Sequence, residues 1–202
     1  HYLHRRQRQM CIRDRYSLSK MTTEAYIRDP RFEVIGVGIK VDDNPPDWYS
    51  GEDVGRFLNS LDYSEDAILA HNTVFDGAIL SWLYGIKPKF WFDTLSMARP
   101  FHHANVGGSL KALANFYNLG QKGDEIIQGL GKKRKDFSPQ ELDRYADYCL
   151  QDINLTYKLY EKLKYKVPVS ELMIIDQTIR MYTEPTIKLD REVLSNHLQK
   201  VK

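Results

Sequence analysis

Asp152 lies in the apolar face of a predicted helix, one turn after Tyr148. From residue 138 onward, apolar side chains recur three and four residues apart, and both residues share that face with Leu155 and Leu159. A carboxylate in such a face is costly unless it is paired, hydrogen-bonded or bound to a metal ion. The Tyr148 hydroxyl can reach the same point. Two interpretations stay open: Asp152 only accepts a tyrosine or backbone hydrogen bond, or it belongs to a functional site.

Asp76 poses the same question at the start of another predicted helix. It follows the short apolar strand 67–70, and if Asn72 or Thr73 caps the helix, Asp76 lies in the first turn. There the helix dipole favours a carboxylate by about 0.3–1 kcal/mol, which is a sufficient reason for one aspartate. It does not explain His71 and Asn72 at the carboxyl end of the strand, where open α/β sheets place their ligand crevices.

Asp76 and Asp152 could together bind a divalent cation. Hard cations such as Mg²⁺ and Mn²⁺ choose oxygen ligands and keep several waters, and carboxylates from two helices would suit them. Such a site favours phosphoryl chemistry, in which one ion activates the attacking water and a second stabilises the leaving oxygen. The pattern is therefore compatible with a Mg²⁺ or Mn²⁺ ion shared by Asp76 and Asp152.

Strands and helices alternate through the middle of the chain and would position these residues. The patterns predict a helix at 22–27, a strand at 32–41, a turn at 42–46, a helix within 47–61, a strand at 67–70, a helix at 73–84, a strand at 89–92, and helices at 95–99 and 109–117. This alternation indicates an α/β layer structure. Asp93 is most simply the N-cap of the helix that follows it.

The last part of the chain begins with a polar, glycine-containing stretch, 120–135, which we expect to be a flexible loop. Ser138, Pro139 and Glu141 then form a strong helix-start signal, with a capping serine, a proline at the first position and a glutamate three residues after the cap. That helix should run to about residue 165. Residues 167–202 resemble the beginning of another unit rather than part of this core.

Charge is distributed unevenly along the 202 residues. The formal net charge is +2, but residues 1–15 contain five arginines and one acid, a net +4, so the rest carries −2. A nucleic-acid partner therefore cannot be argued from overall charge, but only from local patches. Residues 1–15 have neither helical nor strand periodicity. We interpret them as a non-native or disordered basic segment, with a nucleic-acid-binding arm as the alternative.

Two further features of composition concern the compartment. No apolar run approaches the roughly 20 residues of a membrane span. Cys11 and Cys149 form neither a disulfide framework nor a metal-ligand spacing, which suits a reducing cytosol. We therefore expect no membrane partner and a cytoplasmic location.

Two short motifs resemble those of a known enzyme family. HNTVFD at residues 71–76 and YCLQD at 148–152 are similar to the second and third motifs, N-x-x-F/Y-D and Y-x-x-x-D, of the DnaQ-like (DEDD) 3′–5′ exonucleases. The likeness is closest to the tyrosine-type proofreading domain of family A DNA polymerases, including phage ones. WFDTLSMAR and SLKALANFY lie between the motifs, as in that family, and the resemblance covers residues 16–165.

The resemblance implies a fold and a domain organisation. The fold would be ribonuclease H-like, a mixed sheet flanked by helices, with the exonuclease domain at 16–166. Residues 167–202 look like the start of a polymerase domain, or the link to one, in the same native chain. The cell would be a bacterium or a phage-infected host. The substrate would be the single-stranded or frayed 3′ end of DNA.

The resemblance also implies residue roles. Asp76 and Asp152 would be ligands of Mg²⁺ or Mn²⁺, two ions in the intact family site, and Tyr148 would orient the attacking water. Asn72 and Phe75 would hold the 3′ end, the ring by packing on a base, and His71 would belong to the same nucleic-acid contact. Lys111 and the basic run 132–135 are candidate phosphate contacts. For these cations, a merely solvated position is the alternative.

The family's first motif, D-x-E on the opening strand, is missing ahead of the predicted strand at 32–41. Related sequences would carry it where Gln7, Arg8 and Gln9 stand, so we expect the domain to lack its first strand and two of its four metal-binding carboxylates. The one D-x-E in the chain begins at Asp190 and precedes an apolar helical pattern, so we interpret Asp190 as an N-cap.

The sequence thus predicts a 3′–5′ exonuclease domain whose activity is impaired by the missing motif. The alternative of another class is a non-catalytic nucleic-acid-binding module on the same fold. An RNA-degrading relative also stays open, because the motifs do not distinguish the sugars. A nucleotide triphosphatase is a poorer alternative, because GLGKKRK lacks the spacing and the Ser or Thr of a phosphate-binding loop.

Overall fold

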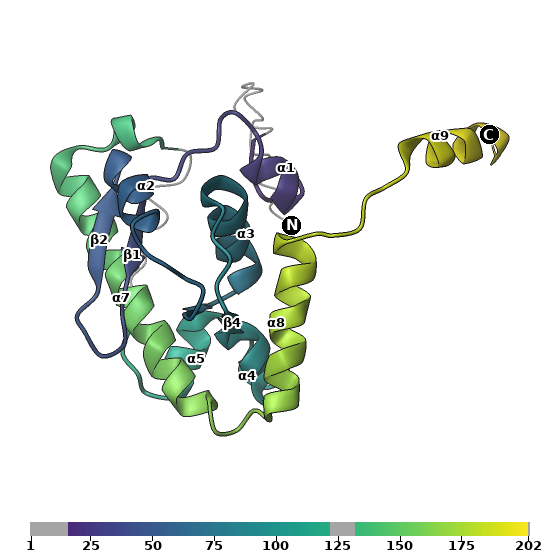
Figure 1. The fold of residues 1–202 in the computed structure, drawn as a ribbon. Coiled ribbons are helices and arrows are strands. Elements are labelled where there is room, and N and C mark those ends of the chain that lie inside the picture. The colour runs from purple at the N-terminus through teal and green to yellow at the C-terminus, as the bar shows by residue number, and fades with distance from the viewer. Residues whose placement is uncertain (1–15, 122–131, 202) are drawn as a thin grey trace, which may run out of the picture.

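The computed structural model describes residues 16–121 and 132–201 (Figure 1). Its elements in chain order are α1 (Thr23–Ile27), β1 (Gly36–Ile39), β2 (Asp47–Ser50), α2 (Glu52–Leu58), β3 (Ala67–Ala70), α3 (Thr73–Tyr84), β4 (Phe90–Asp93), α4 (Thr94–His102), α5 (Leu110–Phe116), the 3-10 turn η2 (Arg134–Asp136), α7 (Pro139–Leu163), α8 (Val169–Thr183) and α9 (Arg191–Val201). The predicted basic segment 1–15 and residues 122–131 of the predicted loop lie outside the described residues.

The strands of the described residues form two small sheets. β1 and β2 are antiparallel, with Gly36 opposite Ser50, whereas β3 and β4 are parallel, with Ala70 opposite Asp93. The predicted α/β class is confirmed. A continuous mixed sheet is not observed in this part of the chain, because β1 and β3 each have a partner on one side only.

The predicted strand 32–41 was too long, and a strand was missed after it. Only Gly36–Ile39 pairs, because the partner strand ends at Ser50, and Gly51 (φ 64°) then turns the chain into α2. β2 was interpreted as the approach to that helix. Its four residues carry little pattern of their own, and their strand conformation depends on pairing with β1.

The elements around the predicted site agree closely with expectation. β3 and α3 have the predicted bounds, and β4 is shifted by one residue to Phe90–Asp93. α4 is longer than predicted and continues through Pro100 to His102. A proline this close to a helix end removes only one hydrogen bond, and the buried residues Met97, Ala98 and His102 hold the last turn against the core.

α7 organises the core of the molecule. Its predicted start is confirmed, since the Ser138 hydroxyl accepts from the Glu141 amide, and the Glu141 carboxylate accepts from the Ser138 amide. α7 packs against β1, β2 and β3 and against α4 and α5. Gly38 permits the close approach to β1, because a Cβ there would lie 2.4 Å from Cδ1 of Ile153. The main core cluster joins α7 to α4 and α5 through Leu155, Leu159, Leu163, Met97, Leu110 and Leu113.

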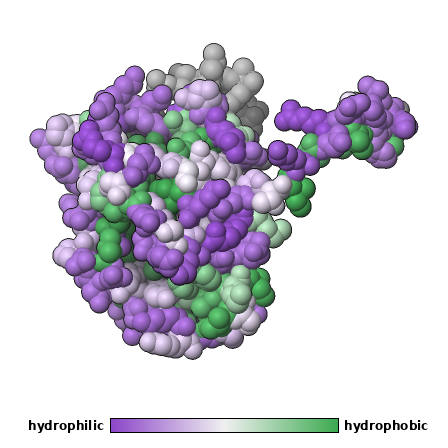
Figure 2. Space-filling view, viewed as in Figure 1, coloured by the Kyte–Doolittle hydropathy of each residue, from purple (hydrophilic) through white to green (hydrophobic). Residues whose placement is uncertain are grey.

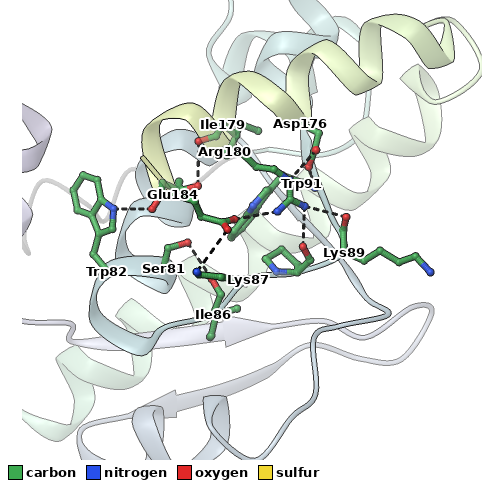
Figure 3. A network of polar contacts seen from close by, with 12 residues as sticks. Ser81, Trp82, Ile86, Lys87, Lys89, Trp91, Asp176, Ile179, Arg180 and Glu184 are labelled. Atoms are coloured by element: carbon green, nitrogen blue, oxygen red, sulfur yellow. Dashed lines mark hydrogen bonds and ion pairs between the residues drawn. The ribbon is translucent and has the colours of Figure 1, made fainter. Parts of the chain in front are cut away.

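α8 covers the outer edge of β4 and belongs to the same packed body (Figure 3). The Trp91 amide donates to Asp176 (2.8 Å), and the Arg180 guanidinium donates to the carbonyls of Pro88 (2.8 Å) and Lys89 (2.9 Å). These bonds satisfy backbone groups that an exposed strand edge would leave open. The expectation that residues 167–202 lie apart from the core is therefore wrong for α8. Its assignment to a polymerase domain stays a prediction.

α9 extends away from the body and buries none of its residues (Figure 1). Asp190 accepts from the amides of Glu192 (3.1 Å) and Val193 (3.0 Å), so its predicted role as an N-cap is confirmed. Figure 2 shows hydrophobic side chains along α9 and at the lower right of the body, in the region of α4 and α8. In the described ranges, no helix is both long and apolar enough to cross a bilayer.

Candidate functional site

The parallel strands β3 and β4 end side by side, and Asp93 ties the segments that follow them together. Its Oδ1 accepts from the amides of Asn72 (2.8 Å), Thr73 (3.2 Å) and Leu95 (3.1 Å). Its Oδ2 accepts from the amide (3.2 Å) and hydroxyl (2.6 Å) of Ser96. Asp93 is only 2% exposed, so these bonds form in a largely dry environment. One carboxylate therefore caps both α3 and α4.

Asn72 and His71 shape the turn between β3 and α3. Asn72 has a left-handed backbone (φ 71°, ψ 51°), which asparagine tolerates better than most residues, and its side chain makes no cap bond. The His71 ring lies between two segments, with Nδ1 2.9 Å from the Thr94 hydroxyl and Nε2 2.9 Å from the Gly108 carbonyl. A carbonyl only accepts, so Nε2 carries a proton. His71 thus joins the β3 end to the loop before α5.

Asp76 is in the first turn of α3, as predicted. The Asp76 side chain is exposed at the surface, although many protein atoms around its carboxylate displace hydrating water. This desolvation raises the pKa of Asp76 to about 6, its own backbone amide opposes the shift, and the Asp93 charge adds to it. Asp76 is therefore a carboxylate whose ionised form lacks compensation, which is a property of many ligand-binding carboxylates.

Tyr148 and Asp152 lie one turn apart on α7, as the spacing predicted. Tyr148 is buried (4% exposed), and burial raises the pKa of its phenol, as do the charge of Asp152 and the hydrogen bond between them. The phenol is thus a neutral hydrogen-bond donor at physiological pH. α7 packs against β3, the strand that leads to His71 and Asn72, so the two motifs lie on elements in direct contact.

The remaining predicted contacts differ in their surroundings. Phe75 is half-buried, and Lys111 is exposed at the second position of α5, three residues after the carbonyl that His71 contacts. Within the run 132–135, Lys132 forms an ion pair with Glu141 (2.7 Å), and Arg134 donates to the Ser50 hydroxyl (2.9 Å). These two cations of the run therefore already support local structure.

Sequence reasoning missed Thr94, Ser96 and Gly108, which complete this end of the sheet. Thr94 is fully buried and donates to the Ala70 carbonyl (3.2 Å) as well as contacting His71. The Asp93-Thr94-Leu95-Ser96 order did signal a capped helix. It carried no sign of the bonds to β3 and α3, because these depend on the register of the parallel strands.

The metal-binding part of the prediction is incomplete in this chain. No group of three or more His, Cys, Asp or Glu side chains that could hold a metal ion occurs among the residues that the structure describes. Asp93 is close to Asp76 but is occupied as a cap. The described donor set therefore offers Asp76 and Asp152 and does not by itself fit a two-metal site.

Comparison with known proteins gave no relative: no family model, no curated protein and no solved structure matches this chain.

Proposed function

We propose that the chain is the 3′–5′ exonuclease domain of a DNA polymerase, in which metal-dependent hydrolysis removes nucleotides from a 3′ end. The observation that carries the proposal is the placement of the two motifs. HNTVFD runs from the carboxyl end of β3 into the first turn of α3, and YCLQD lies on α7, which packs against β3. The motif resemblance supplies the reaction, and the contact between these elements supports it.

The electrostatic properties of the two motifs agree with this proposal. Asp76 has a raised pKa, which a bound cation would lower again by compensating its charge. Tyr148 is a neutral phenol next to Asp152, suited to hold a water by a hydrogen bond while the carboxylate faces a cation. Mg²⁺ or Mn²⁺, when bound, would activate that water and stabilise the leaving oxygen.

The finer fold, a ribonuclease H-like mixed sheet, is part of the proposal. β1 and β3 each have an unpaired edge within the described ranges, and α7 packs against both. A strand that paired with both edges would join the two small sheets into one mixed sheet under α7. We propose that the strand carrying D-x-E takes this position, which would bring its two carboxylates between Asp76 and α7.

The chain as it stands lacks part of the ligand set that this function requires. No D-x-E precedes β1 in the sequence, and the two carboxylates identified do not complete the ligand set. The chain should therefore show little or no exonuclease activity.

Adding the missing strand tests the function directly. An N-terminal β-strand with D-x-E would be joined ahead of Tyr16, and the matched control would carry A-x-A in the same strand. Both proteins would be incubated with 3′-labelled single-stranded DNA and Mg²⁺. We expect stepwise release of nucleotides by the D-x-E protein alone, with loss of release in its Asp152→Ala variant.

One result would contradict the need for the missing motif, and another would contradict the exonuclease function itself. Strong cleavage by the chain as it stands would show that the missing motif is not needed, and equal inactivity of the D-x-E and A-x-A proteins, both folded, would remove the support for catalysis. Binding of single-stranded DNA that ignores Mn²⁺ and is unchanged in Asp76→Ala would favour the alternative, a non-catalytic nucleic-acid-binding module.

A further inference from the structure

The end of the molecule built by the last turns of α4, α5 and α7 exposes aromatic rings. The exposed fractions are 43% for Phe101, 54% for Phe116 and 88% for Tyr165. Every other aromatic side chain of the described residues is at least half-buried. Single exposed apolar residues are ordinary, but three aromatics on one end of the body are not explained by core packing.

The rings form a contiguous cluster. The Phe101 ring centroid lies 6.2 Å from that of His102, His102 lies 4.8 Å from Phe116, and Phe116 lies 5.0 Å from Tyr117. Lys166 extends the cluster, with Nζ 5.0 Å from the centre of the Tyr117 ring. We call Phe101, Phe116, Tyr117 and Lys166 the aromatic surface.

Hydrogen bonds hold this surface in one arrangement. The Tyr117 hydroxyl is hydrogen-bonded to Nε2 of His102 (2.6 Å), which is buried, and accepts from Nζ of Lys166 (3.2 Å). α5 packs on α7, so the rings and Lys166 sit on elements fixed by the main core. A preorganised surface loses little side-chain entropy when a ligand binds.

The two chain segments that carry the aromatic surface are rich in positive charge. Residues 94–121 contain Arg99 and Lys111 and no acidic residue, and residues 158–168 contain four lysines and only Glu161, so these two segments together carry a net charge of +5. The whole chain carries only +2. Glu161, the one acidic residue of these two segments, forms an ion pair with Lys164 (2.7 Å).

From these observations, we infer that the aromatic surface binds single-stranded nucleic acid, with unpaired bases stacked on Phe116 and Phe101 and phosphates beside Lys166. Exposed rings among cations are how proteins hold single strands without reading sequence. A duplex does not fit this chemistry, because its bases are already stacked and only its phosphates would be recognised. Asp93 and Phe101 are eight residues apart along α4, about 12 Å, so the aromatic surface is distinct from the candidate catalytic site.

The test uses the chain as it stands, in EDTA, so that its outcome does not depend on catalysis. The probes are a fluorescein-labelled thymidine 12-mer and an abasic oligonucleotide of the same length, titrated by fluorescence anisotropy. The test variant is Phe101→Ala with Phe116→Ala. The matched control is Leu61→Ala with Leu83→Ala, which removes side chains of similar exposure (40% and 44%) elsewhere on the body.

We expect each lost ring to weaken thymidine 12-mer binding by about 5- to 150-fold, and Phe116→Tyr to retain it, because stacking needs only the ring. Binding of the abasic probe should be unchanged by the phenylalanine substitutions. Lys166→Gln should weaken both probes and lower the slope of log affinity against log salt by about 0.7, whereas Lys188→Gln, outside the surface, should not lower it as much.

Three results would overturn the inference: equal affinity of the test and control variants for the thymidine probe, equal affinity of the folded chain for the abasic and thymidine probes, or no binding of either probe at low salt. Failure of the exonuclease assay would leave these measurements intact, and their failure would leave the exonuclease assay intact.

Discussion

Replacing Asp93 with alanine removes one carboxylate from two helix starts at once. In the turn into α3, the amides of Asn72 and Thr73 lose their acceptor. In α4, the amides of Leu95 and Ser96 and the Ser96 hydroxyl lose theirs. Loss of one N-cap costs about 0.5–2 kcal/mol. Because Asp93 is buried, the freed N–H groups cannot all turn to water, which adds about 1–3 kcal/mol for an unsatisfied buried donor. We expect a free energy of unfolding lower by about 3–5 kcal/mol.

Two further substitutions make this prediction specific. Asp93→Asn keeps one acceptor oxygen but replaces the other with an amide that faces the Ser96 amide, so it should cost about 1–2 kcal/mol. Asp190→Ala also removes an aspartate that accepts from two amides, but the cap is exposed and α9 is not packed on the body. Its loss should change global stability by less than about 0.5 kcal/mol.

The assay is urea denaturation followed by tryptophan fluorescence, since Trp91 is fully buried in the strand that ends at Asp93. For a slope of about 2 kcal/mol per molar urea, the Asp93→Ala midpoint should fall by about 2 M. A cost below about 1 kcal/mol, or one equal to that of Asp190→Ala, would refute the double-cap reasoning.

Three other predictions concern single groups. Desolvation by the surrounding protein atoms raises the pKa of Asp76 to about 6 from 3.8, although the side chain is exposed, so the folded state binds the proton more tightly. Stability should therefore fall as the pH rises from about 4 to 6, and Asp76→Asn should remove this decline in urea midpoints measured across that range. Burial and the nearby Lys166 charge lower the pKa of His102 below 6.5, so stability should fall as the pH drops below 6.5. His102→Phe should reduce this loss of stability at acid pH, and an unchanged loss would assign it to another group. Asp176→Ala removes the hydrogen-bond acceptor of the Trp91 amide at the β4 edge. Hydrogen exchange of the Trp91 amide should then be at least about tenfold faster, while exchange of the α2 amides stays unchanged.

Local chemistry was predictable wherever a few adjacent residues determine it. The capping box of α7 and the caps at Asp93 and Asp190 follow from side chains that reach amides two or three residues away. The bounds of β3 and α3 were likewise predictable, because a short apolar run ends in the polar turn His71-Asn72. The placement of Tyr148 and Asp152 on one helix follows from helical spacing alone.

Features that depend on distant partners were not predictable. β2 is a strand only because β1 lies beside it, and its four residues look like any approach to a helix. α8 has a modest apolar pattern, and its position on the core depends on Asp176 and Arg180 reaching the β4 backbone, 85 or more residues away in sequence. A separate unit was the natural interpretation, since no local signal indicates such contacts.

The hydrogen bonds of Asp93 to distant residues also limit which carboxylates can complete the candidate metal site. Asp93 is the obvious third carboxylate, since it lies at a strand end and its charge acts on Asp76. An ionised carboxylate has about four lone-pair directions, and Asp93 already accepts six hydrogen bonds through its two oxygens, the longest of them from the Thr73 hydroxyl. A cation there would have to displace amides of two helices, at the cost calculated for Asp93→Ala. A metal site that includes Asp76 and Asp152 must therefore obtain its further carboxylates from a segment other than β4. An added strand could supply them at the edges of β1 and β3 that have no partner among the residues the structure describes.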